Sequence, residues 1–273
     1  MDVLGSRIHF LKKGLQDIRA VLADVIDKGA VGSLGRTLRS DPYRRHMELI
    51  FVRHGQPDRS VTGPARSDPP LTAAGHEQAD LTARRIAGRD PLPTELLVSP
   101  ALRSQDTARP ISEQTGLPIE TVDGLVELKM PNWDGVPQES IRRVFDESFN
   151  REPERWWNGL DGGEAFDSFH ERITKALLAV LADRGVRPDA FHDHLWTVEQ
   201  SDQRITVVTH GGTNSVAIAF LLGAAPTPWE WRRLRSRHAS ISRLRAIPFG
   251  GEYVWSLHSF NDLEHLPPEL RTR

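Results

Sequence analysis

The sequence predicts an α/β protein: a three-layer α/β/α sandwich with a mostly parallel central sheet, plus an N-terminal helical extension. Short apolar runs typical of buried strands alternate with segments of helical periodicity, and this order produces a sheet with helices on both faces. Two of the strands, at 48–53 and 205–209, each end in His-Gly. The chain has 273 residues, of which 38% are hydrophobic, enough for one core of roughly 200–250 residues and an appendage. We therefore assign residues 1–46 to the extension and residues 47–273 to one domain.

Composition excludes several classes of function. The formal net charge of −2 gives no electrostatic reason to expect nucleic acid or an anionic membrane as the main partner. The chain has no cysteine, which rules out disulfides, thiolate nucleophiles and zinc–thiolate sites.

The extension has one apolar seam. Its apolar residues recur at alternating steps of three and four, which predicts a helix over residues 7–28: Ile8, Leu11, Leu15, Ile18, Leu22 and Val25. Such a helix could dock on its own domain, pair with a second copy of the chain, or lie at a membrane interface. Because a strict seam favours a helical partner, we take a homodimer as the hypothesis.

Charged residues interrupt every apolar run near the N-terminus, as at Lys12, Lys13 and Asp17, so we expect no signal peptide. No stretch approaches the length of a membrane span. We therefore expect a cytoplasmic protein.

The first strand of the domain, 48–53, runs into Arg53-His54-Gly55. A run of β-formers closed by Gly is typical of a buried strand that ends at the edge of a sheet. A loop at 57–70 follows, and Thr72 is the expected N-cap of a helix that continues to about Ala87.

The next unit repeats this order. A strand at 95–98 leads into Ser99-Pro100, which predicts a helix start because a proline at the first helical position loses no needed donor. Arg103 then lies one turn into a helix that ends near Gly116. A third strand is expected at 119–122, and Glu127 lies on the segment after it.

The second half of the domain begins with a polar excursion at 137–164, which we expect to cover the site. A well-patterned helix at 166–182 and a polar stretch at 185–203 follow. The strand at 205–209 ends in His210-Gly211, and a helix is expected at 214–222. The tail predicts two more strands, at 240–247 and 253–260.

The strand ends bring five chemical groups to one edge of the sheet: Arg53, His54, Arg103, Glu127 and His210. Ligands of open α/β sheets bind at this edge, outside the carboxyl ends of the strands. Two guanidiniums and an imidazolium suit a tetrahedral dianion, and N–H groups at the helix starts after Gly55 and Gly211 add donors. A neutral imidazole there is a nucleophile toward phosphorus, and a carboxylic acid can protonate the leaving oxygen.

In this order the motifs resemble the histidine phosphatase superfamily, also called the phosphoglycerate mutase-like family. The resemblance covers the chain from about residue 48 to its end. It is carried by Arg53-His54-Gly55-Gln56, Leu71-Thr72 with Gly75, Ser99-Pro100 with Arg103, Glu127 with Trp133-Asp134-Gly135, Gly163-Glu164, and His210-Gly211.

The resemblance implies a role for each matching residue. His54 is the expected nucleophile, forming a phosphohistidine, and Glu127 the expected proton donor and then base. The residues expected to bind the phosphoryl group are Arg53, Arg103, His210, Gln56 and Gly211. Neither a metal nor another cofactor is implied, and catalysis is expected to come from positioning and charge stabilisation.

The implied activity is hydrolysis of a small phosphorylated metabolite, such as a sugar phosphate or a phosphoglycerate-like compound. Four residues depart from the family pattern, and we expect them to affect the substrate rim more than the phosphoryl core: Val126, Asp134, Ala165 and His238.

Three other functions stay open. The mutase branch carries a characteristic stretch after Arg-His-Gly, and Pro57-Asp58-Arg59-Ser60 stands there instead, which favours hydrolysis. His192-Asp193-His194 could ligate a metal in a metal-dependent hydrolase. A non-catalytic phospho-ligand binding module is the third.

The leaving group cannot be read from any motif. Three tryptophans of the excursion region could contact a sugar or aromatic leaving group, although packing is the more common use of such residues: Trp133, Trp156 and Trp157.

Overall fold

The domain is built on one mixed sheet of eight strands in the order β3-β2-β6-β1-β7-β8-β5-β4. The computed structural model describes residues 47–58 and 67–273, and the helix predicted at 7–28 lies outside them. The strands are β1 (Glu48–Arg53), β2 (Glu95–Val98), β3 (Ile119–Thr121), β4 (Val186–Pro188), β5 (Trp196–Val198), β6 (Arg204–Thr209), β7 (Ile241–Phe249) and β8 (Glu252–Asp262).

The prediction of a mostly parallel sheet is wrong. Strands β3, β2, β6 and β1 are parallel, but β7, β8, β5 and β4 are joined to them and to one another by antiparallel pairs. The two tail strands form a hairpin, because Gly250 and Gly251 both take positive φ angles that permit a tight turn. Strands β4 and β5 are three residues each and come from the stretch predicted as polar and irregular.

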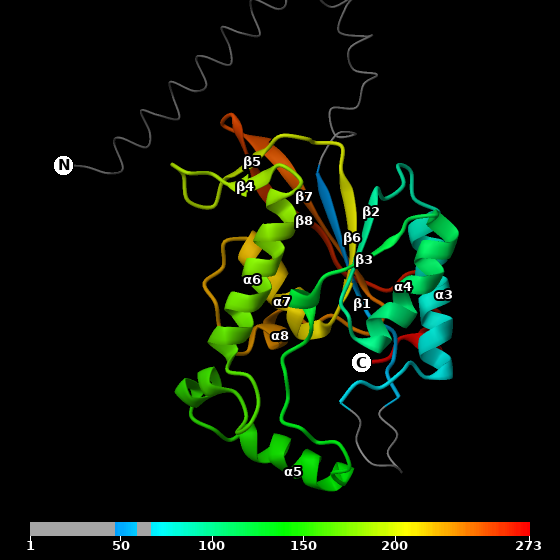
Figure 1. Ribbon diagram of the computed structural model, residues 1–273, viewed down its shortest axis with the longest axis vertical. Coiled ribbons are helices and arrows are strands. Elements are labelled where there is room, and N and C mark those ends of the chain that lie inside the picture. The colour runs from blue at the N-terminus through cyan, green and yellow to red at the C-terminus, as the bar shows by residue number, and fades with distance from the viewer. Residues whose placement is uncertain (1–46, 59–66) are drawn as a thin grey trace, which may run out of the picture. The chain divides into compact units, whose positions relative to one another are not determined.

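Helices cover both faces of the sheet (Figure 1). One face carries α3 (Ala73–Ala87) and α4 (Leu102–Thr115), and the other carries α6 (Phe166–Ala182) and α7 (Gly211–Leu221). The three layers expected from the sequence are therefore present. The remaining helices are α5 (Gln138–Ser148) and α8 (Glu230–Arg233), with short 3₁₀ turns η2 (Asp123–Leu125), η3 (Pro153–Asn158) and η4 (Pro268–Leu270).

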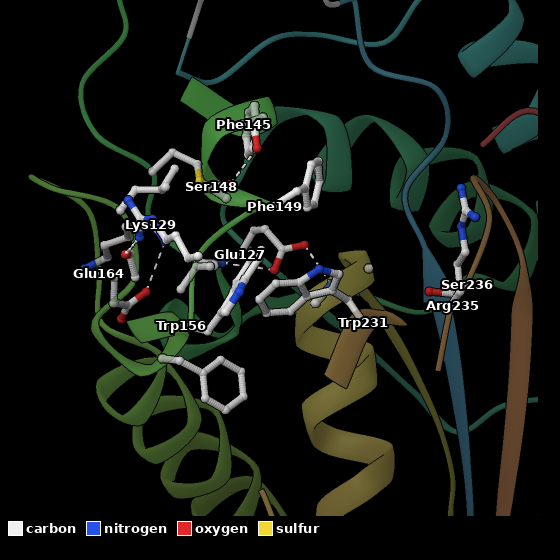
Figure 2. Close-up of a pocket in the computed structure, with 18 of the residues that line it drawn as sticks. Glu127, Lys129, Phe145, Ser148, Phe149, Trp156, Glu164, Trp231, Arg235 and Ser236 are labelled. Carbon is white, nitrogen blue, oxygen red and sulfur yellow. Dashed lines mark hydrogen bonds between the residues drawn. The ribbon is translucent and has the colours of Figure 1, made fainter. Parts of the chain in front are cut away.

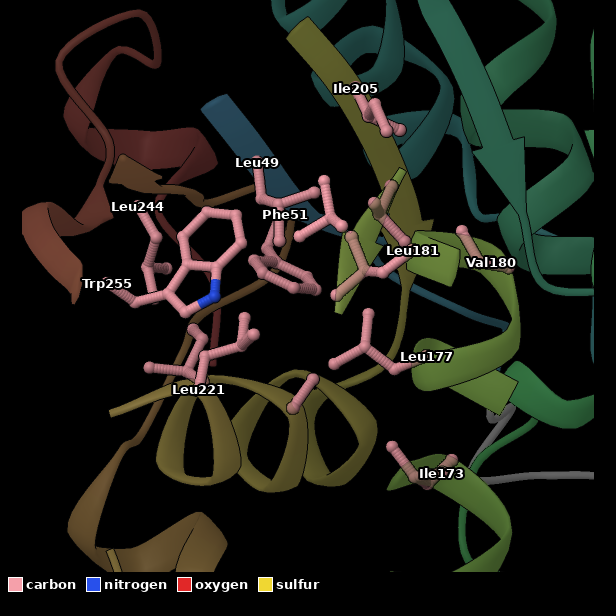
Figure 3. Close-up of a cluster of buried hydrophobic side chains, with 14 of the residues drawn as sticks. Leu49, Phe51, Ile173, Leu177, Val180, Leu181, Ile205, Leu221, Leu244 and Trp255 are labelled. Carbon is pink, nitrogen blue, oxygen red and sulfur yellow. The ribbon is translucent and has the colours of Figure 1, made fainter. Parts of the chain in front are cut away.

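The central strand β1 is buried on both faces, as its unbroken apolar run predicts. Leu49 and Phe51 point into the core beneath α6 and α7, where they meet Leu177, Leu181 and Leu244 (Figure 3). The alternate residues Ile50 and Val52 point into the core beneath α3 and α4. Each such side chain contributes about 1.5–3 kcal/mol when fully buried, so β1 is held rigidly between the two helix layers.

The starts of α3 and α6 agree with the sequence, whereas α4 begins at Leu102 and α7 begins at Gly211, before the expected Asn214. Thr72 is the N-cap of α3, and its Oγ1 accepts from the Gly75 N–H at 3.0 Å. Ser99 and Pro100 precede α4, as predicted, but the N-cap is Ala101. The Ser99 hydroxyl instead contacts the His210 ring, so a tertiary contact takes the place of the expected local cap.

In the part of the chain that the structure describes, no helix combines the length and the apolar character that crossing a membrane requires.

The turn after β1 packs so closely against the start of α3 that the backbones of the two segments lie against each other. A methyl group added at Gly75 would lie 2.3 Å from the Gln56 carbonyl oxygen, and one added at Gly55 would lie 2.5 Å from the Gly75 carbonyl oxygen. Only glycine permits this approach, and the approach fixes the chain on either side of His54.

We expect Gly75→Ala to lower the free energy of unfolding by about 1–3 kcal/mol, because the added methyl forces two backbone segments apart. Chemical denaturation measures this. His76→Ala, at the neighbouring exposed position, is the control and should stay within about 0.5 kcal/mol of the wild type. Equal stability of Gly75→Ala and the wild type would contradict the packing described.

Candidate active site

His54 lies directly after β1 and its side chain is almost wholly buried, with 3% of its surface exposed. Its Nδ1 lies 2.7 Å from the carbonyl oxygen of Gly55. Because a carbonyl only accepts, Nδ1 carries the ring proton and Nε2 keeps a lone pair. That lone pair faces Arg103, whose Nε donates to Nε2 at 3.2 Å. The ring is thus held with its nucleophilic nitrogen toward a guanidinium.

The pKa of His54 lies well below its ordinary value of 6.5. Burial is the largest cause, because it disfavours the charged ring. Electrostatic interactions with His210, Arg103 and Arg53 lower the pKa further, and the hydrogen bond to Gly55 raises it. His54 is therefore a neutral imidazole at physiological pH.

His210 follows β6 and caps α7 from the neighbouring strand end. Its ring centroid lies 5.2 Å from that of His54, edge to face. The Ser99 Oγ lies 2.8 Å from His210 Nε2 and fixes the orientation of the ring. The two strand ends therefore bring together the two imidazoles that the sequence predicted at one edge.

Arg103 lies in the first turn of α4 and is buried. Besides His54 it contacts Asp68, whose Oδ1 lies 3.3 Å from Arg103 Nη1. The Asp68 carboxylate also accepts from the Leu102 N–H at 3.0 Å. Sequence reasoning missed Asp68, because its partners lie more than thirty residues away. It places a negative charge at the start of α4, where an anion is favoured.

Arg53 and Glu127 are linked through the first turn of α7. Arg53 Nη1 donates to the Ser236 carbonyl at 2.7 Å, and a methyl group added at Gly211 would lie 3.5 Å from Arg53 Nε. The next residue, Gly212, donates its N–H to Glu127 Oε2 at 2.9 Å, and Leu128 donates to Oε1 at 3.0 Å. Glu127 is thereby fixed beside the helix start that borders Arg53.

Among the predicted site residues, Gln56 is the least closely connected to the groups around His54. Its Oε1 accepts from the Thr72 hydroxyl at 3.3 Å, and its backbone N–H donates to Gln78 at 2.7 Å. These contacts direct Gln56 toward the start of α3.

His238 lies closer to the nucleophile than its expected place on the substrate rim. Its ring centroid is 5.8 Å from that of His54, and its Nδ1 lies 2.9 Å from the Thr272 hydroxyl. The next residue, Ala239, has a φ of 55° and donates its N–H to the His54 carbonyl at 3.1 Å. This left-handed turn places His238 beside His54, which no local motif indicates.

A pocket of about 310 Å³ opens beside this cluster. Figure 2 shows Glu127, Trp156 and Trp231 among the side chains that line it. Part of its wall comes from the polar excursion, which supplies α5 and η3. Arg53, Gly211 and Gly212 line the same pocket.

The three tryptophans divide between the two uses considered. Trp156 lines the pocket. Trp157 packs on Phe166, with ring centroids 5.6 Å apart, and belongs to the main core. Trp133 packs edge to face on Phe145 at 5.4 Å.

The polar loop at 192–194 is held by hydrogen bonds to a residue that precedes it. His192 Nδ1 lies 2.8 Å from Asp189 Oδ1 on the surface. Within residues 47–58 and 67–273, no group of three or more His, Asp or Glu side chains is placed to hold a metal ion.

The described site therefore combines a neutral imidazole, two guanidiniums, a second imidazole and a carboxyl group beside a pocket. The chain matches the histidine phosphatase superfamily (branch 1) over residues 49–262 and belongs to that superfamily.

The similar proteins include mutases and phosphatases. Probable phosphoglycerate mutase GpmB of Yersinia enterocolitica is 31% identical, over 81% of this chain and 95% of its own length. Adenosylcobalamin/alpha-ribazole phosphatase of Escherichia coli is 27% identical, over 68% of this chain and 85% of its own. The structure of mycobacterial glucosyl-3-phosphoglycerate phosphatase superposes with a TM-score of 0.60 at 25% identity, covering 80% of this chain and 99% of that one.

The lowered pKa of His54 predicts how the free energy of unfolding changes with pH. As the pH falls below 6.5, the unfolded chain takes up a proton that the folded chain does not, so the free energy of unfolding falls until the folded pKa is passed. We expect this fall to be less steep for His54→Asn, by up to about 1.4 kcal/mol per pH unit. Denaturation of both proteins from neutral to mildly acidic pH measures the two slopes.

Two other histidines with lowered pKa values, His170 and His265, are present in both proteins, so their effects cancel in the difference. Identical slopes for the wild type and His54→Asn would contradict a neutral, buried His54.

Proposed function

We propose that this chain is a phosphomonoester hydrolase that acts on a small phosphorylated metabolite through a phosphohistidine at His54. The observation that carries the proposal is the tautomer of His54: its Nδ1 proton is held by the Gly55 carbonyl, and its Nε2 lone pair faces a guanidinium. The superfamily membership supports this chemistry.

In the first step, the Nε2 lone pair of His54 attacks phosphorus in line with the leaving oxygen. The N–P bond forms, the P–O bond to the alcohol breaks, and a protonated Glu127 gives its proton to the leaving oxygen. In the second step, the Glu127 carboxylate takes a proton from water, the water oxygen bonds to phosphorus, and the N–P bond breaks. Phosphate leaves and His54 is again neutral.

The groups around His54 would lower the free energy of the transition state for this phosphoryl transfer. Arg53, Arg103 and His210 would contact the equatorial oxygens, whose charge increases as the phosphoryl group passes between oxygen and nitrogen. The Asp68 carboxylate on Arg103 must share that guanidinium with the substrate or move aside. Gln56 and the Gly211 N–H would complete the binding of the phosphoryl group.

Hydrolysis rather than mutase chemistry is favoured by the turn after His54, where Pro57-Asp58 leads into the loop that precedes α3. The names of two similar proteins, an alpha-ribazole phosphatase and a glucosyl-3-phosphoglycerate phosphatase, also favour it. The second of these supports a sugar phosphate or phosphoglycerate-like substrate. A mutase named among the relatives keeps phosphoryl transfer to a second hydroxyl as the alternative.

The remaining expectations stay predictions. The phosphatase domain proposed here spans residues 47–273, and residues 1–46 form an extension that could join two copies of the chain. A cytoplasmic location, metal-independent catalysis and the absence of nucleic-acid or membrane partners are also predictions.

Glu127→Gln should affect esters according to their leaving group. For ethyl phosphate we expect kcat/KM to fall by about 10²–10⁴, because an alkoxide needs a proton as it leaves. For p-nitrophenyl phosphate we expect a fall of less than about tenfold, since nitrophenolate leaves without one. Initial rates of phosphate release in EDTA measure both.

The controls separate the nucleophile from the acid. His54→Ala should release no phosphate from either ester, and exposed His76→Ala should match the wild type. Phosphate release by His54→Ala would refute the nucleophile. Equal losses for the two esters in Glu127→Gln would refute Glu127 as the proton donor, and activity that EDTA abolishes would indicate a metal-dependent enzyme.

A further inference from the structure

The pocket beside Glu127 is lined mainly by aromatic rings. Trp156 and Trp231 have ring centroids 6.4 Å apart and planes tilted by 55°. Phe149 lies 6.0 Å from Trp156, and Phe166 lies 6.0 Å from Trp231. These four rings form a continuous arc, which we call the aromatic arc. The arc and Glu127 line the same pocket, so a leaving group that receives a proton from Glu127, as proposed above, would lie against the arc.

The ring planes of Trp156 and Trp231 are inclined to each other, so the two indoles do not face each other in parallel. Their separation leaves no room for a ring between parallel faces, but a flat ring can lie on one indole and present its edge to the other. At the outer end of the arc, Phe149 is half exposed and carries the Arg232 guanidinium 4.5 Å from its ring centroid. A large aromatic residue left exposed at the mouth of a pocket is typical of a ligand-binding surface.

The pocket offers little to a polyol. Besides the indole N–H groups of Trp156 and Trp231, its neutral polar side chains are Ser148 and Ser236, and the Ser148 hydroxyl already donates to the Phe145 carbonyl at 2.7 Å. No Asn, Gln, Asp or Thr side chain lines it. Away from the charged groups, a sugar hydroxyl taken into the pocket would find few partners to replace its hydrogen bonds to water, which is costly. The aromatic part of the lining therefore favours an apolar ring over the sugar ring that the name of one similar protein suggests.

With Glu127 and the ion pair of Glu164 set aside, the charged side chains that line the pocket are positive: Arg53, Lys129, Arg151 and Arg235. Glu164 is paired with Arg172 at 2.8 Å, and although burial raises its pKa, the hydrogen bonds from Arg172 and the Lys129 backbone hold that pKa below the ordinary value. Arg235 lies across the pocket from Glu164 (Figure 2). Arg235 and Arg151 line the pocket, and no carboxylate of the described residues pairs with either. An anionic group on the leaving alcohol would meet Arg235.

We propose that the leaving group is an apolar, flat ring that bears a carboxylate, with the ring on the aromatic arc and the carboxylate at Arg235. This inference rests on the proposed phosphatase function and names its substrate class: phosphate monoesters of aromatic hydroxy acids.

The test compares primary alkyl phosphates, whose leaving alkoxides are chemically alike, so that differences report the pocket alone. They are phenethyl, p-carboxyphenethyl, p-nitrophenethyl, propyl and glycerol phosphate. We expect kcat/KM for phenethyl phosphate to exceed that for propyl and glycerol phosphate by about tenfold or more. The carboxylate compound should exceed its neutral nitro isostere by about three- to tenfold, as expected for a partly exposed charge pair.

Substitutions in the pocket test which residues cause the preference for a ring and the preference for a carboxylate. Trp156→Leu should remove most of the ring preference, and Trp156→Phe should keep it, because a flat face is retained. Arg235→Gln should abolish the preference for carboxylate over nitro. Arg142→Gln, an equal loss of charge on the exposed side of α5 and outside the pocket lining, should leave both preferences unchanged.

Hydrolysis of propyl or glycerol phosphate as fast as phenethyl phosphate would overturn the proposal, as would an unchanged carboxylate preference in Arg235→Gln. If no ester is hydrolysed, the phosphatase function fails, and the pocket is tested separately by calorimetry. Binding of p-carboxyphenethyl alcohol that Trp156→Leu abolishes would then support the ring site, and no binding would overturn it.

Discussion

The parallel pairing of β1 with β6 is the constraint on which the site depends. Its register sets Arg53 opposite Thr209, so the two following residues, His54 and His210, leave the sheet at the same edge. The His54 N–H donates to the Thr209 carbonyl at 2.9 Å, and the His54 carbonyl accepts from Ala239 on the other side at 3.1 Å. The backbone of the nucleophile is thus fixed by both neighbouring strands, and burial of β1 on both faces keeps it there.

This rigidity explains how so many positive groups can share one small space. Arg53, Arg103 and His210 lie around a ring that burial keeps neutral, and under the proposed function a phosphoryl dianion would bring negative charge to them. Asp68 supplies part of that charge in the structure. In the proposed reaction these donors are held in place before substrate arrives, while Asp68 must share Arg103 with the substrate or move aside.

Much of this could be predicted from sequence, because the signals are local. Strand ends in His-Gly, the Thr72 cap and the periodicity of α6 each depend on a few neighbouring residues. The mixed sheet could not be predicted in the same way, since β4 and β5 are three residues long and are formed by pairing with distant strands. Asp68 on Arg103, Ser99 on His210 and His238 beside His54 are also contacts between distant segments. The aromatic arc draws its rings from η3, the C-cap of α5, α6 and α8, whose spacing in sequence carries no common motif.

The most direct test of the central claim is to find the covalent intermediate. Glu127→Gln protein, in which the hydrolysis of the intermediate should be slowed, is mixed with p-nitrophenyl phosphate, quenched in alkali to preserve phosphohistidine, and mapped by mass spectrometry. We predict a phosphoryl group on His54 and none on the His54→Ala counterpart treated in the same way. Release of nitrophenolate with no phosphoryl group on His54, or with one on a different residue, would contradict the mechanism.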